Sequence, residues 1–362
     1  MKKTFITQPF LPPFDECVED LQNIWENKFL TNNGAYHEKF EVELAKFLEV
    51  PFVSLVNNAT SGLLIALKVL DCNEEVITTP FSFIATSHAI KWNGLEPVFA
   101  DTDHMIGNLL PSSVEKKINS KTSGILAVHN YGLPGNLDEM DYLSKKHSLP
   151  LIYDAAPAMG VKFRNQSLFK YGDVSVISFH ATKVFTTFEG GAVISKSQET
   201  KIKIDRMRNF GIVDENTVSG LGINAKMNEF SAALGIIQLK YLKAIISKRK
   251  AVYDFYAKGL KENKYCNIIK ISRDIEYNYA YCPIIFEKGI KARDKAYKAL
   301  KKKNIFCRKY WFPLITEHDA YSSSKSDELK NALQLSQKIL FLPIYPGLED
   351  KTISIILSIL NQ

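Results

Sequence analysis

Short apolar runs alternate with helix-like segments between residues 50 and 195. The strand-like runs cover residues 52–56, 75–79, 96–101, 123–129, 149–154, 173–179 and 191–195. After the first run, Leu63, Ala66 and Leu70 recur at helical spacing, and residues 136–147 show the same periodicity. Strands that alternate with helices predict an α/β fold with a mainly parallel central sheet.

The pattern changes beyond this region. A long helical stretch begins near Ala225, where Met227, Phe230 and Leu234 fall on one face, and it continues past residue 250. The rest of the chain holds two strand-like and three helix-like segments, at 279–286, 305–311, 290–303, 327–338 and 350–361. We therefore expect a large α/β domain, residues 1–245, joined by the long helix to a smaller C-terminal α+β domain, residues 246–362.

The composition is that of an ordinary globular protein, with 46% hydrophobic and 23% charged residues. The net charge of +7 is spread along the chain, and no basic stripe interleaved with aromatic residues accompanies it. This distribution favours a solvated basic surface over a nucleic-acid interface. An excess of positive charge also suits an anionic small substrate.

The five cysteines are irregularly spaced, and none belongs to a CxxC pair. Their spacing predicts neither a disulfide framework nor a metal site, and it fits a protein of the reducing cytoplasm. No apolar run in the sequence is long enough to span a bilayer, so we expect no membrane segment.

Polar residues follow several predicted strands, at the sheet edge where open α/β folds bind ligands. The segment NNATS, residues 57–61, can present backbone N–H groups to an anion, although its polar side chains could simply cap a helix. Asp154 ends an apolar strand, where it either pairs with a cationic ligand group or caps a helix. Asn224 precedes the long helix and, taken alone, is a polar N-cap residue.

Lys183 stands in the segment SFHATKVFTTFEGG, residues 178–191. Ser178 ends a strand, Lys183 follows five residues later, and a Gly-Gly pair comes soon after it. A lysine held against apolar neighbours is partly desolvated, and its free amine can form a Schiff base. The glycines would let the backbone pass close to a bound ring. Without the other features, Lys183 would be read as a surface lysine.

Together these features match the needs of pyridoxal 5′-phosphate (PLP). The ring nitrogen of PLP needs a carboxylate, its aldehyde needs a lysine, and its phosphate needs a helix N-terminus and hydroxyl groups. Phe83, just beyond another strand end, can cover the face of the ring. The sequence thus predicts a PLP site that includes Asp154, Ser178 and Lys183.

With these features, the chain resembles the DegT/StrS family of sugar-nucleotide aminotransferases, which are fold type I PLP enzymes. The resemblance covers essentially the whole chain. It rests on motifs in the right order, among them FLTNNGAYHEKFEVELAKFL, LVNNATSGLLIAL, TTPFSFIAT, AVHNYGLPGNLDEM, YDAAPAMG, SFHATKVFTTFEGG and GINAKMNEFSAALG. It implies a fold type I PLP-transferase that catalyses transamination.

The resemblance also implies a role for each matched residue. Lys183 would hold PLP as an internal aldimine and move the proton during transamination. Asp154 would pair with the pyridine nitrogen, and Phe83 would stack on the ring. The residues that would bind the phosphate are Ala59, Thr60, Ser178 and Asn224. Because Asn224 resembles an asparagine that reaches the phosphate of the other subunit, a homodimer with shared active sites is expected.

One position departs from the family pattern. Pro157 stands where the family usually has Gln or His, whose side chain bonds the ring hydroxyl. Proline has no side-chain donor, so either another group or water serves, or the activity is altered.

Within the family, the motifs around Lys183 and Asn224 look most similar to enzymes that aminate dTDP-4-keto-6-deoxyglucose. Glutamate would be the amino donor, and dTDP-4-amino-4,6-dideoxyglucose for cell-surface glycans would be the product. A 3-keto sugar nucleotide, a UDP sugar and a non-catalytic PLP-binding regulatory protein are the alternatives. His180 could approach the sugar or serve structurally, and Arg308 could lie at the nucleotide-sugar entrance or at a strand edge.

Overall fold

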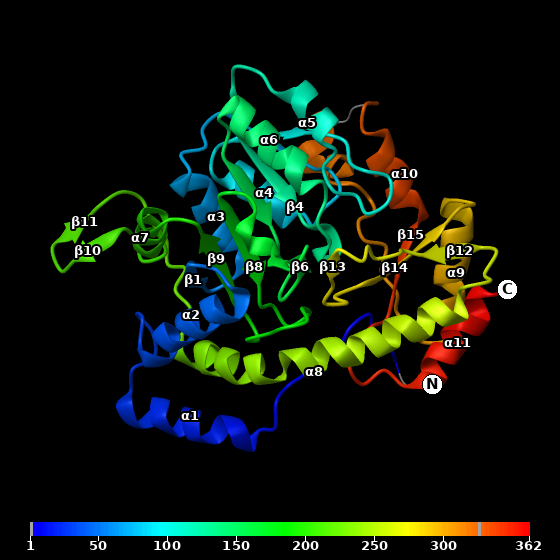
Figure 1. The fold of residues 1–362 in the computed structure, drawn as a ribbon, viewed down its shortest axis with the longest axis horizontal. Helices are drawn as coiled ribbons and strands as arrows, with labels where there is room; N and C mark the ends of the chain where they lie inside the picture. The colour runs from blue at the N-terminus through cyan, green and yellow to red at the C-terminus, as the bar shows by residue number, and fades with distance from the viewer. Residues whose placement is uncertain (1–2, 325–326) are drawn as a thin grey trace.

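The computed structural model describes residues 3–324 and 327–362 and is built around a seven-stranded sheet (Figure 1). The strand order is β1-β9-β8-β5-β4-β2-β3. Neighbouring strands from β8 to β3 are parallel, whereas β9 runs antiparallel to both β1 and β8. The predicted mainly parallel α/β sheet is therefore confirmed. Its strands are β1 (Phe52–Val56), β2 (Glu75–Thr78), β3 (Glu96–Phe99), β4 (Thr122–Val128), β5 (Leu151–Asp154), β8 (Val174–Ser178) and β9 (Gly191–Ser195).

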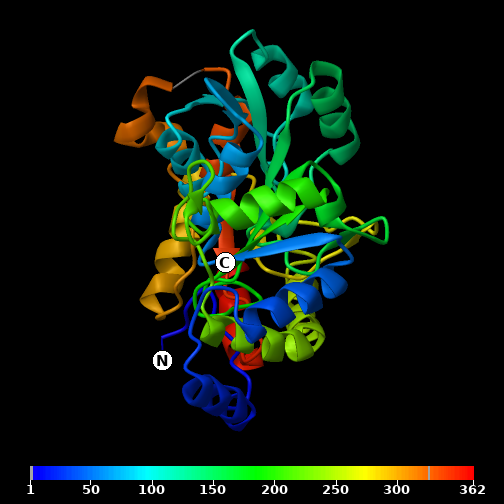
Figure 2. The ribbon, with the colours of Figure 1, turned by 90° about the vertical axis from the view of Figure 1, so that its left-hand side faces the viewer.

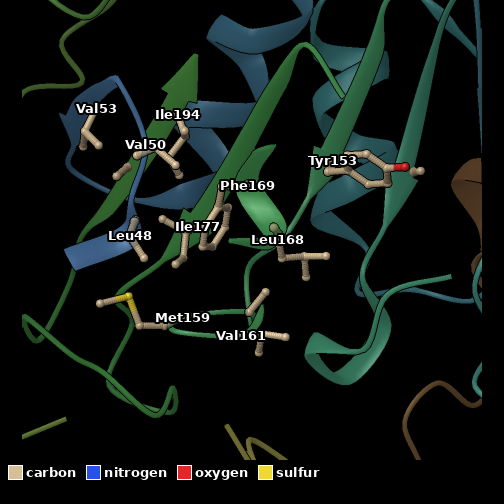
Figure 3. Packing of buried hydrophobic residues seen from close by; sticks show 14 of the residues in the cluster. Leu48, Val50, Val53, Tyr153, Met159, Val161, Leu168, Phe169, Ile177 and Ile194 are labelled. Carbon is tan, nitrogen blue, oxygen red and sulfur yellow. The ribbon is translucent and has the colours of Figure 1, made fainter. Parts of the chain in front are cut away.

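Helices cover both faces of this sheet. Because alternate residues of a strand point to opposite faces, Ala127 joins one hydrophobic core and Leu126 joins the other. Figure 3 shows part of the first core, where Ile177 and Ile194 from neighbouring strands lie together. The first core is covered by α2 (Ala35–Leu48), α5 (Pro111–Lys117), α6 (Leu137–His147) and the first half of α8 (Glu229–Gly259). The second is covered by α3 (Ala59–Val69), α4 (Ala85–Trp92) and α7 (Gln198–Met207).

A smaller antiparallel sheet forms the C-terminal part of the chain, with strand order β12-β14-β15. Its core is shared with the second half of α8, through Tyr253 and Tyr256. The elements of this part are β12 (Cys266–Ile268), β14 (Cys282–Phe286), β15 (Ile339–Leu342), α9 (Ile290–Lys302), α10 (Lys330–Lys338) and α11 (Asp350–Leu360). Helix α8 thus contributes to the cores of both parts. The expected boundary between residues 245 and 246 falls inside this helix and stays a prediction.

Helix α8 begins at Glu229, so the expected start near Ala225 is wrong. The Asn228 side chain caps the helix by accepting a hydrogen bond from the backbone N–H of Ser231 at 2.8 Å. The segment before Asn228 is held by other backbone contacts, since the Ala225 N–H donates to the Arg208 carbonyl at 2.9 Å. By length and composition α8 could cross a membrane, but 56% of its most apolar window is buried inside the protein, where it packs as a core helix.

The expected strand at 305–311 is also wrong. Ile305 and Cys307 are buried and alternate with more exposed neighbours, as in a strand. However, the backbone of this segment forms only two single bridges, from Ile305 to Thr4 and from Arg308 to Phe341. The alternating burial of this segment therefore does not come from pairing with a neighbouring strand.

The remaining elements lie around this framework. Helix α1 (Asp15–Asn27) packs on the outer side of α8, at the edge of the molecule (Figures 1 and 2). The hairpin of β10 (Ile212–Asp214) and β11 (Thr217–Val218) projects from the body (Figure 1). A third small sheet joins β13 (Ile275–Glu276), β6 (Lys162–Phe163) and β7 (Gln166–Ser167). Short 3₁₀ helices occupy 130–132, 168–170, 315–317 and 319–324.

Candidate active site

Asp154 lies at the carboxyl end of β5 and is buried, with 6% of its surface exposed. Its Oδ2 accepts a hydrogen bond from Thr86 Oγ1 at 2.7 Å, and its Oδ1 accepts one from the Ala156 N–H at 3.2 Å. Burial raises the pKa of Asp154 above its ordinary value, while these hydrogen bonds and the nearby charge of Lys183 oppose the rise. A buried carboxylate whose direct donors are neutral is suited to a cationic ring N–H.

Lys183 lies half-buried in the loop between β8 and β9. Its backbone N–H donates to the His180 carbonyl at 2.9 Å, and the next two side chains, Val184 and Phe185, are buried. Lys183 is close enough to Asp154 for its positive charge to lower the pKa of that carboxyl. The fold therefore brings the two residues together, although 29 positions separate them in the sequence.

Three predicted phosphate ligands meet at the start of α3. The Asn58 side chain caps this helix by accepting from the Ser61 N–H at 2.9 Å. Within residues 3–324 and 327–362, the N–H groups of Ala59 and Thr60 find no partner, as expected for an open helix N-terminus. Ser178 accepts a hydrogen bond from the His180 N–H at 3.3 Å, and its own proton is not used by any described residue. These groups together offer an anion two N–H donors and a hydroxyl.

Gly191 allows the donors of Ala59, Thr60 and Ser178 to lie close together. It pairs with Ser178 across β8 and β9, and it sits directly against the first turn of α3. A Cβ atom at this position would lie 2.9 Å from the Ala59 nitrogen and 2.8 Å from the Ile177 carbonyl oxygen. Only glycine lets the strand approach the helix N-terminus so closely.

Phe83 lies two residues before the first residue of α4, with 58% of its surface exposed. Its ring centroid is 5.8 Å from that of Trp311, whose Nε1 donates to Asn130 Oδ1 at 3.1 Å. This exposed aromatic ring stands three residues before Thr86, whose hydroxyl bonds the Asp154 carboxylate, and it is suited to cover a cofactor ring.

Sequence reasoning missed Thr86, Trp311 and Asn130. Thr86 carried a usable signal, because it is a hydroxyl residue one turn after Phe83 in a helix that follows a strand end. Trp311 and Asn130 carried none, because they are 181 positions apart and meet only in the folded chain.

Asn224 is exposed, and the structure places its backbone beside the start of α3 in the same chain. Its carbonyl accepts a hydrogen bond from Asn57 Nδ2 at 3.3 Å. The contact of its side chain with the phosphate of a second subunit stays a prediction.

The two open readings of His180 can now be compared with its contacts. Its Nδ1 lies 2.8 Å from Thr182 Oγ1, and its Nε2 lies 3.6 Å from Glu189 Oε1. Nδ1 is therefore within hydrogen-bond distance of a hydroxyl in the Lys183 loop, which fits the structural reading, whereas the distance from Nε2 to Glu189 is too long for a hydrogen bond. Arg308 is exposed next to Tyr310, whereas its neighbour Lys309 pairs with Asp294 at 2.7 Å.

Pro157 offers the site no side-chain hydrogen-bond donor, because the proline side chain has none. Its carbonyl accepts a hydrogen bond from Asn278 Nδ2 at 2.8 Å, which anchors the turn that follows Asp154. The side chain of residue 157 therefore cannot donate a hydrogen bond to the ring hydroxyl of a cofactor.

The donor set fits PLP. A buried carboxylate, a lysine near it, an open helix N-terminus with a serine hydroxyl, and an exposed aromatic ring supply what the ring nitrogen, aldehyde, phosphate and ring face require. In the part of the chain that the structure describes, no three His, Cys, Asp or Glu side chains are grouped to hold a metal ion.

Thr86 gives a direct test of this arrangement. We expect Thr86→Val to weaken PLP binding by about tenfold or more, because it removes a hydrogen bond to a charged carboxylate while keeping the side-chain shape. Thr86→Ser keeps the hydroxyl and is the matched control. PLP titration of the apoprotein measures the effect, and equal affinities for the two variants would contradict it.

Comparison with known proteins shows the family of this chain. Residues 14–361 match the DegT/DnrJ/EryC1/StrS aminotransferase family. The chain is 41% identical, over its whole length and 99% of the relative, to dTDP-4-amino-4,6-dideoxy-D-glucose transaminase of Shigella dysenteriae. It is 43% identical to the Escherichia coli protein of the same name, over 96% of this chain and 95% of that one.

The fold also agrees with solved structures. The crystal structure of DesI in the presence of its TDP-sugar product matches with a TM-score of 0.94 at 28% identity, over 100% of this chain and 93% of that chain. The predicted fold of PLP aminotransferases is thereby confirmed. This protein therefore belongs to the DegT/DnrJ/EryC1/StrS aminotransferase family and is a PLP-dependent aminotransferase.

Proposed function

We propose that this protein transfers the amino group of glutamate to dTDP-4-keto-6-deoxyglucose and so forms dTDP-4-amino-4,6-dideoxyglucose for cell-surface glycans. The observation that carries the chemistry is the buried Asp154 carboxylate beside Lys183, with an open anion site at the start of α3. The choice of sugar is supported by the names of the relatives that share 41% and 43% of their residues with this chain.

Each residue of the site has a defined task in this reaction. When bound, PLP would supply an electron sink for the carbanion that forms when the carbon bearing the amino group loses its proton. Asp154 keeps the ring nitrogen protonated. Lys183 Nζ takes the proton from the α-carbon of glutamate and, in the second half of the reaction, delivers a proton to C4 of the sugar.

Binding and orientation come from the other residues. The N–H groups of Ala59 and Thr60 and the hydroxyl of Ser178 hold the phosphate, since no described residue accepts a hydrogen bond from these three donors. Phe83 covers the ring, and Trp311 supports Phe83 from the side of the C-terminal part. Their apolar surfaces also exclude water from the reacting carbon.

An absorbance experiment tests the proposal directly. The purified protein with PLP should show the band of lysine-bound cofactor, which glutamate should bleach and dTDP-4-keto-6-deoxyglucose should restore. Bleaching without restoration would keep the transaminase and reject this sugar, and a panel with 3-keto and UDP-linked sugars would then identify the acceptor. A band that glutamate fails to bleach would reject glutamate as the amino donor.

We also propose a homodimer. Phe14 and Trp25 on or next to α1 are 73% and 74% exposed, and Phe188 and Phe230 stack on each other with ring centroids 5.7 Å apart while both stay exposed. Apolar surface of this kind on a folded chain fits a protein partner. Because Phe188 belongs to the loop that carries Lys183, a second copy of the chain seated here would lie next to the active site.

Mixed dimers test whether the sites are shared. We expect Lys183→Ala and Asn224→Ala to be poorly active alone and to regain activity when their subunits are exchanged. One site of the mixed dimer would then combine an intact Lys183 with an intact Asn224 from the partner. Activity assays after subunit exchange measure this, and a lack of recovery in proven mixed dimers would place Asn224 in its own subunit's site.

For the location of the protein, we propose the cytoplasm. All five cysteines lie in the described part of the chain and are free thiols, and four of them are buried. Unpaired thiols fit a reducing compartment.

A further inference from the structure

A cluster of charged side chains around the buried Arg208 lies outside the active site, against the outer edge of the seven-stranded sheet. Arg208, at the end of α7, is 3% exposed and bonds Glu41 Oε1 of α2 through Nη1 at 2.6 Å. Its Nη2 bonds Asp205 Oδ1 at 2.9 Å. Lys201 Nζ lies 2.9 Å from both Glu41 Oε2 and Asp205 Oδ2. Two cations and two carboxylates thus neutralise one another.

This cluster satisfies the free edge of β1, the outermost strand. The Leu55 N–H donates to Glu41 Oε1 at 2.9 Å, and the Leu55 carbonyl accepts from Arg208 Nη1 at 2.7 Å. The Val53 carbonyl accepts from Lys201 Nζ at 2.8 Å. Edge groups without a strand partner need such donors and acceptors, so the charged side chains fix the position of β1.

The backbone of Arg208 is also linked to the candidate active site, through two backbone hydrogen bonds. Its carbonyl accepts from the Ala225 N–H at 2.9 Å, and the Ala225 carbonyl accepts from the Asn57 N–H at 2.8 Å. Asn57 is the residue after β1 and also donates through Nδ2 to the Asn224 carbonyl. Arg208 therefore holds both the strand that leads into α3 and the segment that carries Asn224.

His37 and Lys226 are further titratable groups near Arg208, and the Nε2 atom of His37 lies 3.4 Å from Arg208 Nη1. Burial and the charge of Arg208 lower the pKa of His37 to about 4. His37 is therefore neutral at physiological pH and adds no charge to the cluster.

We propose that Arg208 is a positioning residue for the phosphate end of the cofactor site. Its side chain sets the end of β1 and so the open N–H groups of α3, and its carbonyl sets residues 224–225 and so Asn224, which serves the phosphate site of the partner subunit. The inference rests on the proposed roles of Ala59, Thr60 and Asn224 as phosphate ligands. Arg208 itself touches neither cofactor nor substrate.

The test is PLP binding to the apoprotein of two arginine variants. Arg208→Met should raise the PLP dissociation constant about tenfold or more, because it removes charged donors from Leu55 and Glu41. Arg206→Met is the matched control, since Arg206 is exposed on the same helix and its side chain bonds no described residue. The affinity for inorganic phosphate, measured by its competition with PLP, should fall by a similar factor in Arg208→Met and stay unchanged in Arg206→Met.

A second readout separates positioning from folding. At saturating PLP, the absorbance maximum of the lysine-bound cofactor should be unchanged in Arg208→Met, because Asp154 and Lys183 lie at the other end of the cofactor. A variant that loses thermal stability but binds PLP like Arg206→Met would overturn the proposal. If Arg208→Met does not fold, Glu41→Gln should show a smaller rise in the dissociation constant, and unchanged binding there would also overturn it. Failure of the unmodified protein to bind PLP would instead refute the proposed function.

Discussion

Replacing Lys183 with alanine is expected to remove the band of lysine-bound PLP and to reduce turnover on the order of a thousandfold or more. The variant loses both the amine that bonds the cofactor and the base that moves the proton. Asp154 and the open start of α3 remain, so we expect PLP still to bind without a covalent link. Absorbance spectroscopy and a transaminase assay on the same preparation measure both effects.

The matched control is Lys196→Ala. Lys196 follows β9, is exposed, and should leave both the spectrum and the rate unchanged. Turnover by a clean preparation of Lys183→Ala would remove Lys183 from the catalytic role. Loss of PLP binding in this variant, with the protein still folded, would show that the lysine contributes most of the cofactor affinity.

Asp154→Asn should have opposite effects on activity and on the stability of the apoprotein. Asparagine cannot keep the ring nitrogen protonated, so we expect the rate to fall about 10²–10³-fold. The same change removes a buried carboxylate whose hydrogen-bond donors among the described residues, Thr86 and Ala156, are neutral, and it should raise the thermal stability of the apoprotein. The rate and the unfolding temperature of the apoprotein are the two measurements.

The difference in stability between the unmodified apoprotein and Asp154→Asn should depend on pH, in a direction set by the raised pKa of Asp154. Below the ordinary Asp pKa of 3.8, the carboxyl is protonated in both the folded and the unfolded chain, and burial carries no charge penalty. As the pH rises through the raised folded pKa of Asp154, the unfolded chain ionises first, so the apoprotein loses stability. The advantage of Asp154→Asn in the free energy of unfolding should therefore grow over this window and then level off.

Urea unfolding of both apoproteins across this pH range checks the prediction. Asp71→Asn is the control, because Asp71 is exposed and its left-handed backbone conformation suits asparagine. An advantage for Asp154→Asn that is independent of pH would mean that the carboxylate is not destabilising in the apoprotein.

The sequence by itself determined the sheet and the order of the chemical groups. Period-2 and helical patterns predicted the seven central strands within a few residues, because each strand is buried and its signal is local. Parallel strands present their carboxyl ends at one edge, so Asp154, Ser178 and the NNATS segment could be expected to share a site. Lys183 became distinctive only together with these residues and with the family resemblance.

The tertiary structure alone decided the contacts that position these groups. Thr86 bonds Asp154 across 68 positions, and Arg208 bonds Leu55 across 153. It also decided that α8 starts at Glu229 and that residues 305–311 do not pair as a strand, since both depend on backbone partners from elsewhere in the chain. Local patterns report burial and periodicity, whereas the partner of a buried hydrogen-bonding group is fixed only when distant segments meet.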